Sequence, residues 1–269
     1  MSNELRLRAG VRVSTVAQSL KLLITAGTNL ASGGRGLQTQ QNSYLSWVED
    51  IDRALHLYFT AAWVWEELYT PRWVEIRGLT PASPRPYPLI AGEAQTQSDR
   101  LKEIVERLER SQAHFDLSGK FVAVVPDTNV FLHYRFFDEI DWPGLVRAKE
   151  VRIVVPLLVI KQLDEKTYRS DDRGDRAKKA IRTLRKLQAG LPTPEAPADV
   201  RAGVSVQLLM DPPGHQRSGN DDDELLTRAE YLSSLTDGRV YVATGDYGMQ
   251  AQATLRGLKC LELPDDLRL

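Results

Sequence analysis

Two short apolar runs of this chain lead to an aspartate, and they are the first indication of chemistry. Residues 122–126 run directly into Asp127, and residues 240–243 are followed closely by Asp246. Runs of this length that are rich in valine are typical of strands buried in a parallel sheet. Ligands of such sheets bind at the edge where the strands end. We therefore expect the two carboxylates to lie at one edge of a sheet.

Two further groups of acidic residues could join them. The run Asp221–Asp223 lies at the predicted start of a helix, where the helix N-terminus offsets the repulsion among carboxylates. The pair Asp164 and Glu165 closes the segment that follows another apolar run, 151–156. Converging carboxylates stay ionised together only where a cation neutralises them. Ligation by oxygen alone suits Mg²⁺ or Mn²⁺, which would activate water for phosphodiester cleavage.

Other interpretations of single residues remain open. Each acid taken alone is equally a helix cap or a solvated charge, and only the joint placement favours a metal site. The histidines His133 and His215 have no partner at metal-ligand spacing, so we interpret them as structural or surface residues. The single cysteine, Cys260, excludes a disulfide within the chain and a zinc site built from several thiolates.

A basic segment lies between the second and third acidic groups. Residues 173–186 contain seven lysines and arginines against one acid, Asp175, on a predicted amphipathic helix. A solvated basic face is the simpler interpretation. Beside a phosphodiester-cleaving site, the same face would hold a nucleic-acid backbone. The candidate residues for that contact are Arg173, Arg176, Lys179, Arg182 and Arg185.

The elements that would position these residues alternate between strands and helices from about residue 119. This alternation predicts an α/β fold with a parallel sheet, flanked by helices and joined by right-handed crossovers. We place a domain boundary near residue 116, which divides the chain into residues 1–116 and residues 117–269. The predicted strands cover residues 122–126, 151–156, 204–210, 240–243 and 257–263.

The N-terminal region is predicted to be mostly helical and carries no motif that we can attach to chemistry. Apolar residues at steps of three and four predict one helix over about 43–69. Four prolines within residues 79–98 predict a linker or surface loop, and a helix follows at about 97–113. This region could bind a protein partner or a second copy of the chain.

The overall composition of the chain indicates less about its function than these local patterns do. The 35 lysines and arginines nearly balance the 36 aspartates and glutamates, so net charge identifies no partner. No apolar run approaches the length needed to span a bilayer, and the charged N-terminus is a poor signal peptide. We expect a cytoplasmic protein without membrane contact.

From about residue 119 to 263 the chain resembles the PIN-domain family of metal-dependent nucleases. Four motifs in the family's order carry this resemblance: Val-Pro-Asp127-Thr-Asn129, then Val-Val-Pro156-Leu-Leu-Val-Ile-Lys-Gln162-Leu-Asp164, then Asn220-Asp-Asp-Asp223-Glu-Leu-Leu, then Val-Ala-Thr244-Gly-Asp246. The subgroup that it resembles most is related to the domains that precede PhoH-type ATPases and to those of eukaryotic decay nucleases. The resemblance implies a PIN-like fold and a ribonuclease that requires Mg²⁺ or Mn²⁺.

The resemblance also implies a role for individual residues. Asp127 and Asp246 would be metal ligands, and Asn129 and Thr244 would orient water or carboxylates. The third motif leaves the ligand open between two neighbours, and helical phase favours Asp222 over Asp221.

The second motif departs from the family pattern. Gln162 stands where the family has a glutamate, and an amide cannot supply negative charge. Asp164 or Glu165 would then supply it and join the catalytic set. This departure leaves open a non-catalytic PIN-like module that binds RNA or a protein. A structure-selective DNA nuclease is the other alternative, because the chemistry is shared.

Overall fold

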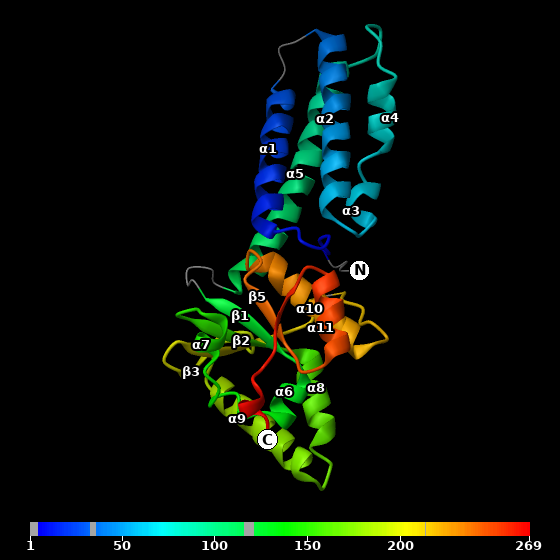
Figure 1. The fold of residues 1–269 in the computed structure, drawn as a ribbon. Helices are drawn as coiled ribbons and strands as arrows, with labels where there is room; N and C mark the ends of the chain where they lie inside the picture. Colours follow the sequence, from blue (N-terminus) through cyan, green and yellow to red (C-terminus); the bar gives the residue numbers. More distant parts are fainter. Residues whose placement is uncertain (1–4, 33–35, 116–120, 213) are drawn as a thin grey trace. The chain divides into compact units, whose positions relative to one another are not determined.

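The computed structural model describes residues 5–32, 36–115, 121–212 and 214–269 (Figure 1). The chain forms two compact units, which divide between Gln112 and Ala113. The predicted boundary near residue 116 lies outside the described residues. None of the described helices combines the length and the apolar composition that crossing a membrane requires.

The N-terminal unit is helical. Its long helices α1, α2 and α5 lie side by side in Figure 1, and they meet at Gly27 of α1. A Cβ atom at Gly27 would lie 2.4 Å from the ring of Trp47 and 2.3 Å from the hydroxyl of Ser98, so only glycine permits this approach. The helices are α1 (Val13–Ala31), α2 (Leu37–Tyr58), α3 (Trp63–Glu66), α4 (Pro71–Arg77) and α5 (Pro86–Ala113).

The prediction of one helix over residues 43–69 is wrong at its C-terminal end. Helix α2 ends at Tyr58, and Phe59 adopts an extended conformation that forms a bridge to Leu7. The carbonyl of Tyr58 accepts a hydrogen bond from the backbone N–H of Arg8 at 2.8 Å. The helix therefore stops because the N-terminal segment pairs with the residues that follow it.

The prediction of a linker over residues 79–98 is wrong from Pro86 onward, where α5 begins. Proline lacks an N–H group, but the first turn of a helix does not use that group. Pro86 and Pro88 both fall in this first turn. These prolines therefore start a helix instead of preventing one.

The C-terminal unit contains a six-stranded sheet in the order β3-β4-β2-β1-β5-β6. All neighbours are parallel except β3 and β4, which form an antiparallel pair at one edge. The central strands are rich in buried valine, as expected of strands covered on both faces. The predicted α/β fold is confirmed. The strands are β1 (Val122–Pro126), β2 (Val151–Pro156), β3 (Ala198–Arg201), β4 (Val204–Leu209), β5 (Val240–Ala243) and β6 (Lys259–Leu261).

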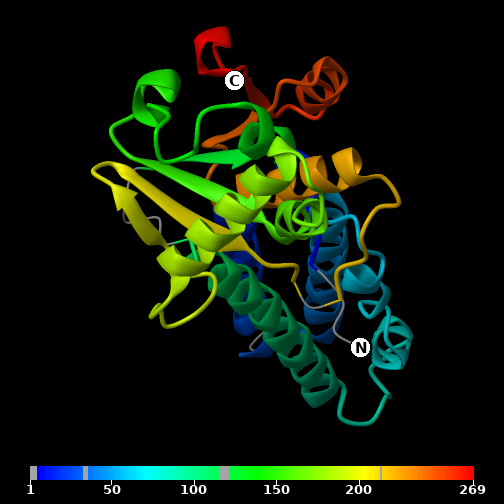
Figure 2. The same ribbon diagram turned by 90° about the horizontal axis from the view of Figure 1, so that it is seen from below.

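Helices surround this sheet, and Figure 2 shows α8 and α9, in yellow-green, lying across it. The register of β1 and β5 places Pro126 opposite Ala243, so that Asp127 and Thr244 leave the sheet next to each other. The helices are α6 (Thr128–His133), α7 (Trp142–Val146), α8 (Leu157–Lys166), α9 (Asp172–Gln188), α10 (Asp221–Leu235) and α11 (Tyr247–Leu255), followed by the 3-10 helix η1 (Asp265–Leu267).

Candidate functional site

A cavity of about 180 Å³ lies at the C-terminal edge of the sheet, beyond the end of β1. The starts of α6, α10 and α11 and one face of α8 surround it. Most of the polar residues that line it come from the predicted motifs. The lining residues are Asp127, Thr128, Asn129, Leu158, Gln162, Lys166, Asp221, Asp222, Leu225 and Met249.

Asp127 is the buried acid of this cavity, with only 4% of its surface exposed. Its Oδ1 accepts a hydrogen bond from the backbone N–H of Val130 at 2.9 Å and so caps α6, while its Oδ2 accepts one from the Thr244 hydroxyl at 2.6 Å. Burial raises the pKa of Asp127, and the negative charge of Asp222 raises it further, against the lowering effect of these hydrogen bonds. Asp127 is therefore a helix cap and a candidate ligand at once.

Thr244 links the first and fourth motifs. Its buried hydroxyl donates to Asp127 and accepts a hydrogen bond from the backbone N–H of Asp246 at 3.0 Å. Asp246 is exposed, and its Oδ1 caps α11 through the N–H of Met249 at 3.0 Å. Gly245 between them packs against Tyr134, whose hydroxyl would lie 2.7 Å from a Cβ atom at this position.

The start of α10 contributes two acids to the cavity. Asn220 caps this helix by accepting hydrogen bonds from the N–H groups of Asp222 and Asp223 at 2.8 and 3.1 Å. Asp221 and Asp222 both line the cavity, whereas Asp223 pairs with Arg256. Partial burial raises the pKa of Asp222, and the charges of Asp246 and Asp221 raise it further. The structure therefore brings Asp222 into electrostatic contact with both strand-end acids.

Gln162 crosses the cavity from α8. Its Nε2 donates to Oδ2 of Asp221 at 2.8 Å, and its Oε1 accepts a hydrogen bond from the Thr128 hydroxyl. Lys166 lies one helical turn further along the same face of α8 and also lines the cavity. Our sequence analysis did not identify this cation, although its four-residue spacing from Gln162 was a usable signal.

Asp164 and Glu165 do not reach this cavity. They line a separate pocket of about 340 Å³ between α8 and α9, where Oδ1 of Asp164 lies 3.9 Å from Nη2 of Arg185. Two positions along a helix turn a side chain by about 200°, so Asp164 faces away from Gln162. The expectation that one of these two acids replaces the missing glutamate therefore requires correction.

Some of the basic side chains of helix α9 form contacts within the protein. Nη2 of Arg176 donates to the carbonyls of Phe131, at 3.1 Å, and of Tyr134, and so binds the end of α6. Nζ of Lys179 lies 4.1 Å from the centre of the Phe136 ring. Arg176 thus holds α9 against the end of α6, and Lys179 contacts the segment that follows α6, which limits the use of both residues in binding nucleic acid.

The other predicted contact residues of α9 are exposed. Arg185 lies near Asp164, as described above. Within the part of the chain that the structure describes, Arg173 and Arg182 form no ion pair. These two arginines are therefore the members of the predicted set that are most accessible to a phosphate backbone.

A second group of possible metal ligands links the segment before α10 to the first turn of that helix. Ligand atoms of Asp211, His215 and Glu224 lie within 4.8 Å of one another, and they form the one such group of three among the described residues. Nε2 of His215 lies 2.6 Å from Glu224, with both side chains at most 3% exposed. Arg217, at 2.8 Å, and Arg228, at 3.8 Å, balance the charge of Asp211. We interpret this group as a buried network that fixes the segment before α10.

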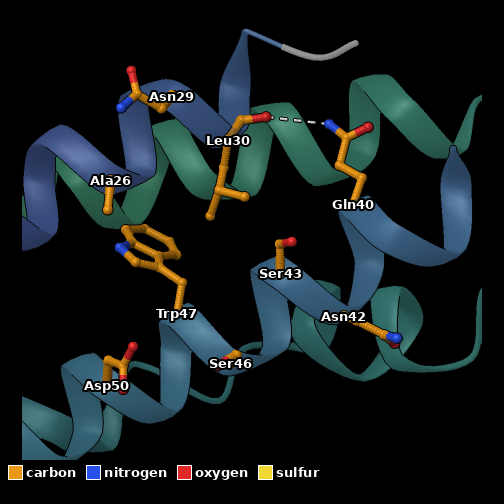
Figure 3. Close-up of a pocket in the computed structure, with 9 residues that line it drawn as sticks. All are labelled: Ala26, Asn29, Leu30, Gln40, Asn42, Ser43, Ser46, Trp47 and Asp50. Atoms are coloured by element: carbon orange, nitrogen blue, oxygen red, sulfur yellow. Dashed lines mark hydrogen bonds between the residues drawn. The ribbon is translucent and has the colours of Figure 1, made fainter. Parts of the chain in front are cut away.

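A pocket of about 580 Å³ lies in the helical unit, between α1 and α2 (Figure 3). Trp47 forms one wall, and Nε2 of Gln40 donates to the carbonyl of Leu30 at 3.2 Å. Asp50 is the single ionisable residue of its lining, and it pairs with Arg53. This pocket therefore offers no set of groups for acid–base or metal chemistry.

The residues that build the sheet and its cavity match a known protein family. A family model described as "PIN domain" matches residues 124–263, which span the whole sheet-edge cavity. No curated protein matches the chain. The chain is similar to a solved structure described as a domain of a functionally unknown protein from Methanocaldococcus jannaschii DSM 2661. The identity is 17%, the match covers 53% of this chain and 91% of that chain, and the TM-score is 0.36.

Proposed function

The chain belongs to the PIN-domain family, and from this premise we propose that its C-terminal unit is a divalent-metal-dependent ribonuclease. PIN domains are generally nucleases. One observation carries the proposal: three carboxylates, those of Asp127, Asp221 and Asp222, line a single cavity at the C-terminal edge of the sheet. A cation held among such groups would relieve their repulsion and keep them ionised.

The chemistry of these side chains suits Mg²⁺ or Mn²⁺, although the ligand atoms of Asp127, Asp222 and Asp246 do not all lie within 4.8 Å of one another. Asp127, Asp222 and Asp246 would hold the ion through oxygen atoms, which are the ligands that these cations prefer. When bound, such an ion lowers the pKa of a coordinated water and neutralises charge on the phosphoryl oxygens. Thr244 would keep the Asp127 carboxylate oriented through its hydrogen bond, and Asn129 would orient water or a neighbouring carboxylate.

Two parts of the proposal depend on the motif pattern. The resemblance of the four motifs to decay nucleases favours RNA over DNA as substrate, and the placement in that subgroup stays a prediction. The single cysteine supports a cytoplasmic setting. A protein partner or a second copy of the chain at the N-terminal unit also stays a prediction.

A non-catalytic module that binds nucleic acid is the second candidate. The observation that favours it is the hydrogen bond from Gln162 to Asp221. Gln162 occupies the position at which a glutamate would have been a fourth acid in the cavity. With less negative charge the site would bind a cation more weakly, while the surrounding basic residues would still hold a phosphate backbone.

The test is cleavage of single-stranded RNA and of single-stranded DNA with Mn²⁺, with Mg²⁺ or with EDTA. Asp127→Asn keeps an oxygen to cap α6 but removes the charge, so we expect a loss of about 100-fold or more. The matched control is Asp164→Asn, which the structure places outside the cavity and which should retain activity. Cleavage that persists in EDTA or in the Asp127 variant would refute the proposal. Binding without cleavage would support the second candidate.

A further inference from the structure

Two tyrosines beside the cavity expose almost their whole side chains. Tyr168 is 88% exposed and Tyr247 is 83% exposed. An aromatic ring usually buries much of its area in a core or an interface. The helical unit contains a more ordinary case, Tyr69, which is 47% exposed and packs edge-on against Trp73 at 5.0 Å.

Neither exposed tyrosine has a ring partner of its own. Among the residues that the structure describes, Tyr168 and Tyr247 take part in no aromatic pair and no cation–π contact. Most of the surface of each tyrosine is therefore accessible from the solvent.

The two tyrosines lie close in the chain to residues of the site, on different elements. Tyr247 is the first residue of α11 and directly follows Asp246, one of the candidate metal ligands. Tyr168 follows α8, two residues after Lys166, which lines the cavity. In Figure 1 the turn between α8 and α9 lies at the lower end of the view, away from α11.

Cations and acids alternate in the chain around Tyr168, and Asp171 pairs with Arg169. Lys166 lies at the end of α8, and Arg173 lies in the first turn of α9, with Tyr168 between them in the chain. The C-terminal segment adds Arg268, because the N–H of Leu269 donates to the carbonyl of His133 at 3.0 Å. Burial lowers the pKa of His133, and the charges of Arg173, Arg268, Arg176 and Lys166 lower it further.

A cationic track with accessible aromatic rings is the arrangement that binds single-stranded nucleic acid. The cations hold the phosphates, and every base can stack on a ring because every base has a π face. In a duplex the bases already stack on one another, so an exposed tyrosine gains little from them. The rings therefore select for unpaired bases.

We propose that Tyr168 and Tyr247 stack on unpaired bases of the nucleic acid at two sides of the carboxylate cavity, with Lys166 and Arg173 binding the phosphates near Tyr168. This inference rests on the proposed function, which places the strand across the cavity. Under this proposal, Tyr168 and Tyr247, which lie outside the four motifs, cause a preference for single-stranded over double-stranded nucleic acid.

The test measures binding in EDTA, so that cleavage does not consume the probe. A fluorescein-labelled single-stranded RNA of about 12 nucleotides serves as probe for fluorescence anisotropy. Tyr168→Ala and Tyr247→Ala should each weaken binding by about tenfold or more, whereas phenylalanine at either position should retain it. Both side chains are exposed, so unchanged thermal unfolding should accompany the loss.

Controls separate stacking from a general loss of surface area. Leu255→Ala removes an 88% exposed side chain from α11, and Tyr87→Ala removes a 44% exposed tyrosine from the helical unit. Neither change should alter binding. A blunt duplex of the same sequence should bind more weakly than the single strand, and the alanine variants of Tyr168 and Tyr247 should leave its binding unchanged. Equal losses for duplex and single strand would overturn the inference.

The outcomes also separate this inference from the nuclease proposal. If the wild type cleaves with Mn²⁺ but both alanine variants bind the single strand as tightly as the wild type, base stacking is wrong and the nuclease stands. If the alanine variants lose binding but the wild type never cleaves, the nuclease proposal fails and the base-binding residues stand. A wild type that binds no probe would overturn the stacking inference, and cleavage with Mn²⁺ would still decide the nuclease proposal.

Discussion

Gln162 connects two sides of the cavity through its amide group, which donates at one end and accepts at the other. It donates to Asp221 at 2.8 Å and accepts from Thr128. A glutamate at this position could not donate to Asp221, because an ionised carboxylate only accepts hydrogen bonds. The glutamine therefore stabilises the cavity in the absence of a cation, at the cost of one negative charge.

This argument predicts opposite effects of Gln162→Glu with and without metal. In EDTA the new carboxylate would face Asp221 and repel it, so the melting temperature should fall. With Mn²⁺ the added ligand should make the metal-induced rise in melting temperature larger than in the wild type. Thermal unfolding over a Mn²⁺ titration measures both effects.

The matched controls for this prediction are Asp164→Asn and Glu165→Gln, whose side chains line the separate pocket between α8 and α9. Both variants should respond to Mn²⁺ like the wild type. If either one abolished the response, the assignment of the metal site to the cavity beside Asp127 would be wrong.

At the scale of elements, α9 has a structural function besides its proposed contact with nucleic acid. Arg176 binds two carbonyls at the end of α6. We expect Arg176→Gln to lower the free energy of unfolding by about 1–3 kcal/mol, because carbonyl groups lose a charged donor. Arg182→Gln, on the exposed face, should change it by less than about 0.5 kcal/mol. Urea denaturation of both variants measures the difference, and equal values would contradict this function of Arg176.

The start of α9 predicts a dependence of stability on pH. Asp171 caps the helix through the N–H of Gly174 at 3.1 Å and pairs with Arg169 at 2.7 Å. The pKa of Asp171 is lowered from 3.8 to about 2. The hydrogen bonds from Arg169 are the largest cause of this shift, and the hydrogen bond from the N–H of Gly174 is a smaller cause. A lowered pKa in the folded state means that this stabilisation is complete above 3.8 and is lost as the pH falls toward about 2.

Asp171→Asn should therefore unfold at a lower temperature than the wild type near neutral pH, and the difference should shrink as the pH falls through this window. Melting temperatures from pH 7 downward measure the effect. Because the pair is exposed, added salt should also reduce the difference. A difference that stays constant at low pH would show that the carboxylate charge does not matter.

At the scale of the whole molecule, the two units have separate cores. Leu20, Val48 and Ile51 are buried in the helical unit, and Val124 and Val154 are buried in the sheet of the other. A unit with its own core is expected to fold alone. Residues 113–269, expressed without the helical unit, should therefore unfold cooperatively and retain the response to Mn²⁺. A fragment that fails to fold or to respond would show that the helical unit is required for the site.

The sequence by itself determined the sheet and the edge of the sheet from which Asp127 and Thr244 emerge. The apolar runs before Asp127 and Asp246 predicted parallel strands. Because parallel strands end at one edge of the sheet, the sequence was enough to predict that both strand ends lie at the same edge. The acidic start of α10 was also predicted, because helix capping depends on adjacent residues. These predictions succeeded because the patterns that encode them are short and local.

Only the tertiary structure decided which side chains share the cavity with those acids. The phase of α8 against its neighbours turned Gln162 and Lys166 toward Asp221 and turned Asp164 toward α9. The packing of α9 on α6 likewise engaged Arg176, which in the sequence looks like any other exposed arginine. These outcomes depend on contacts between residues far apart in the chain, and the spacing of residues along one helix does not determine which neighbour each face will meet.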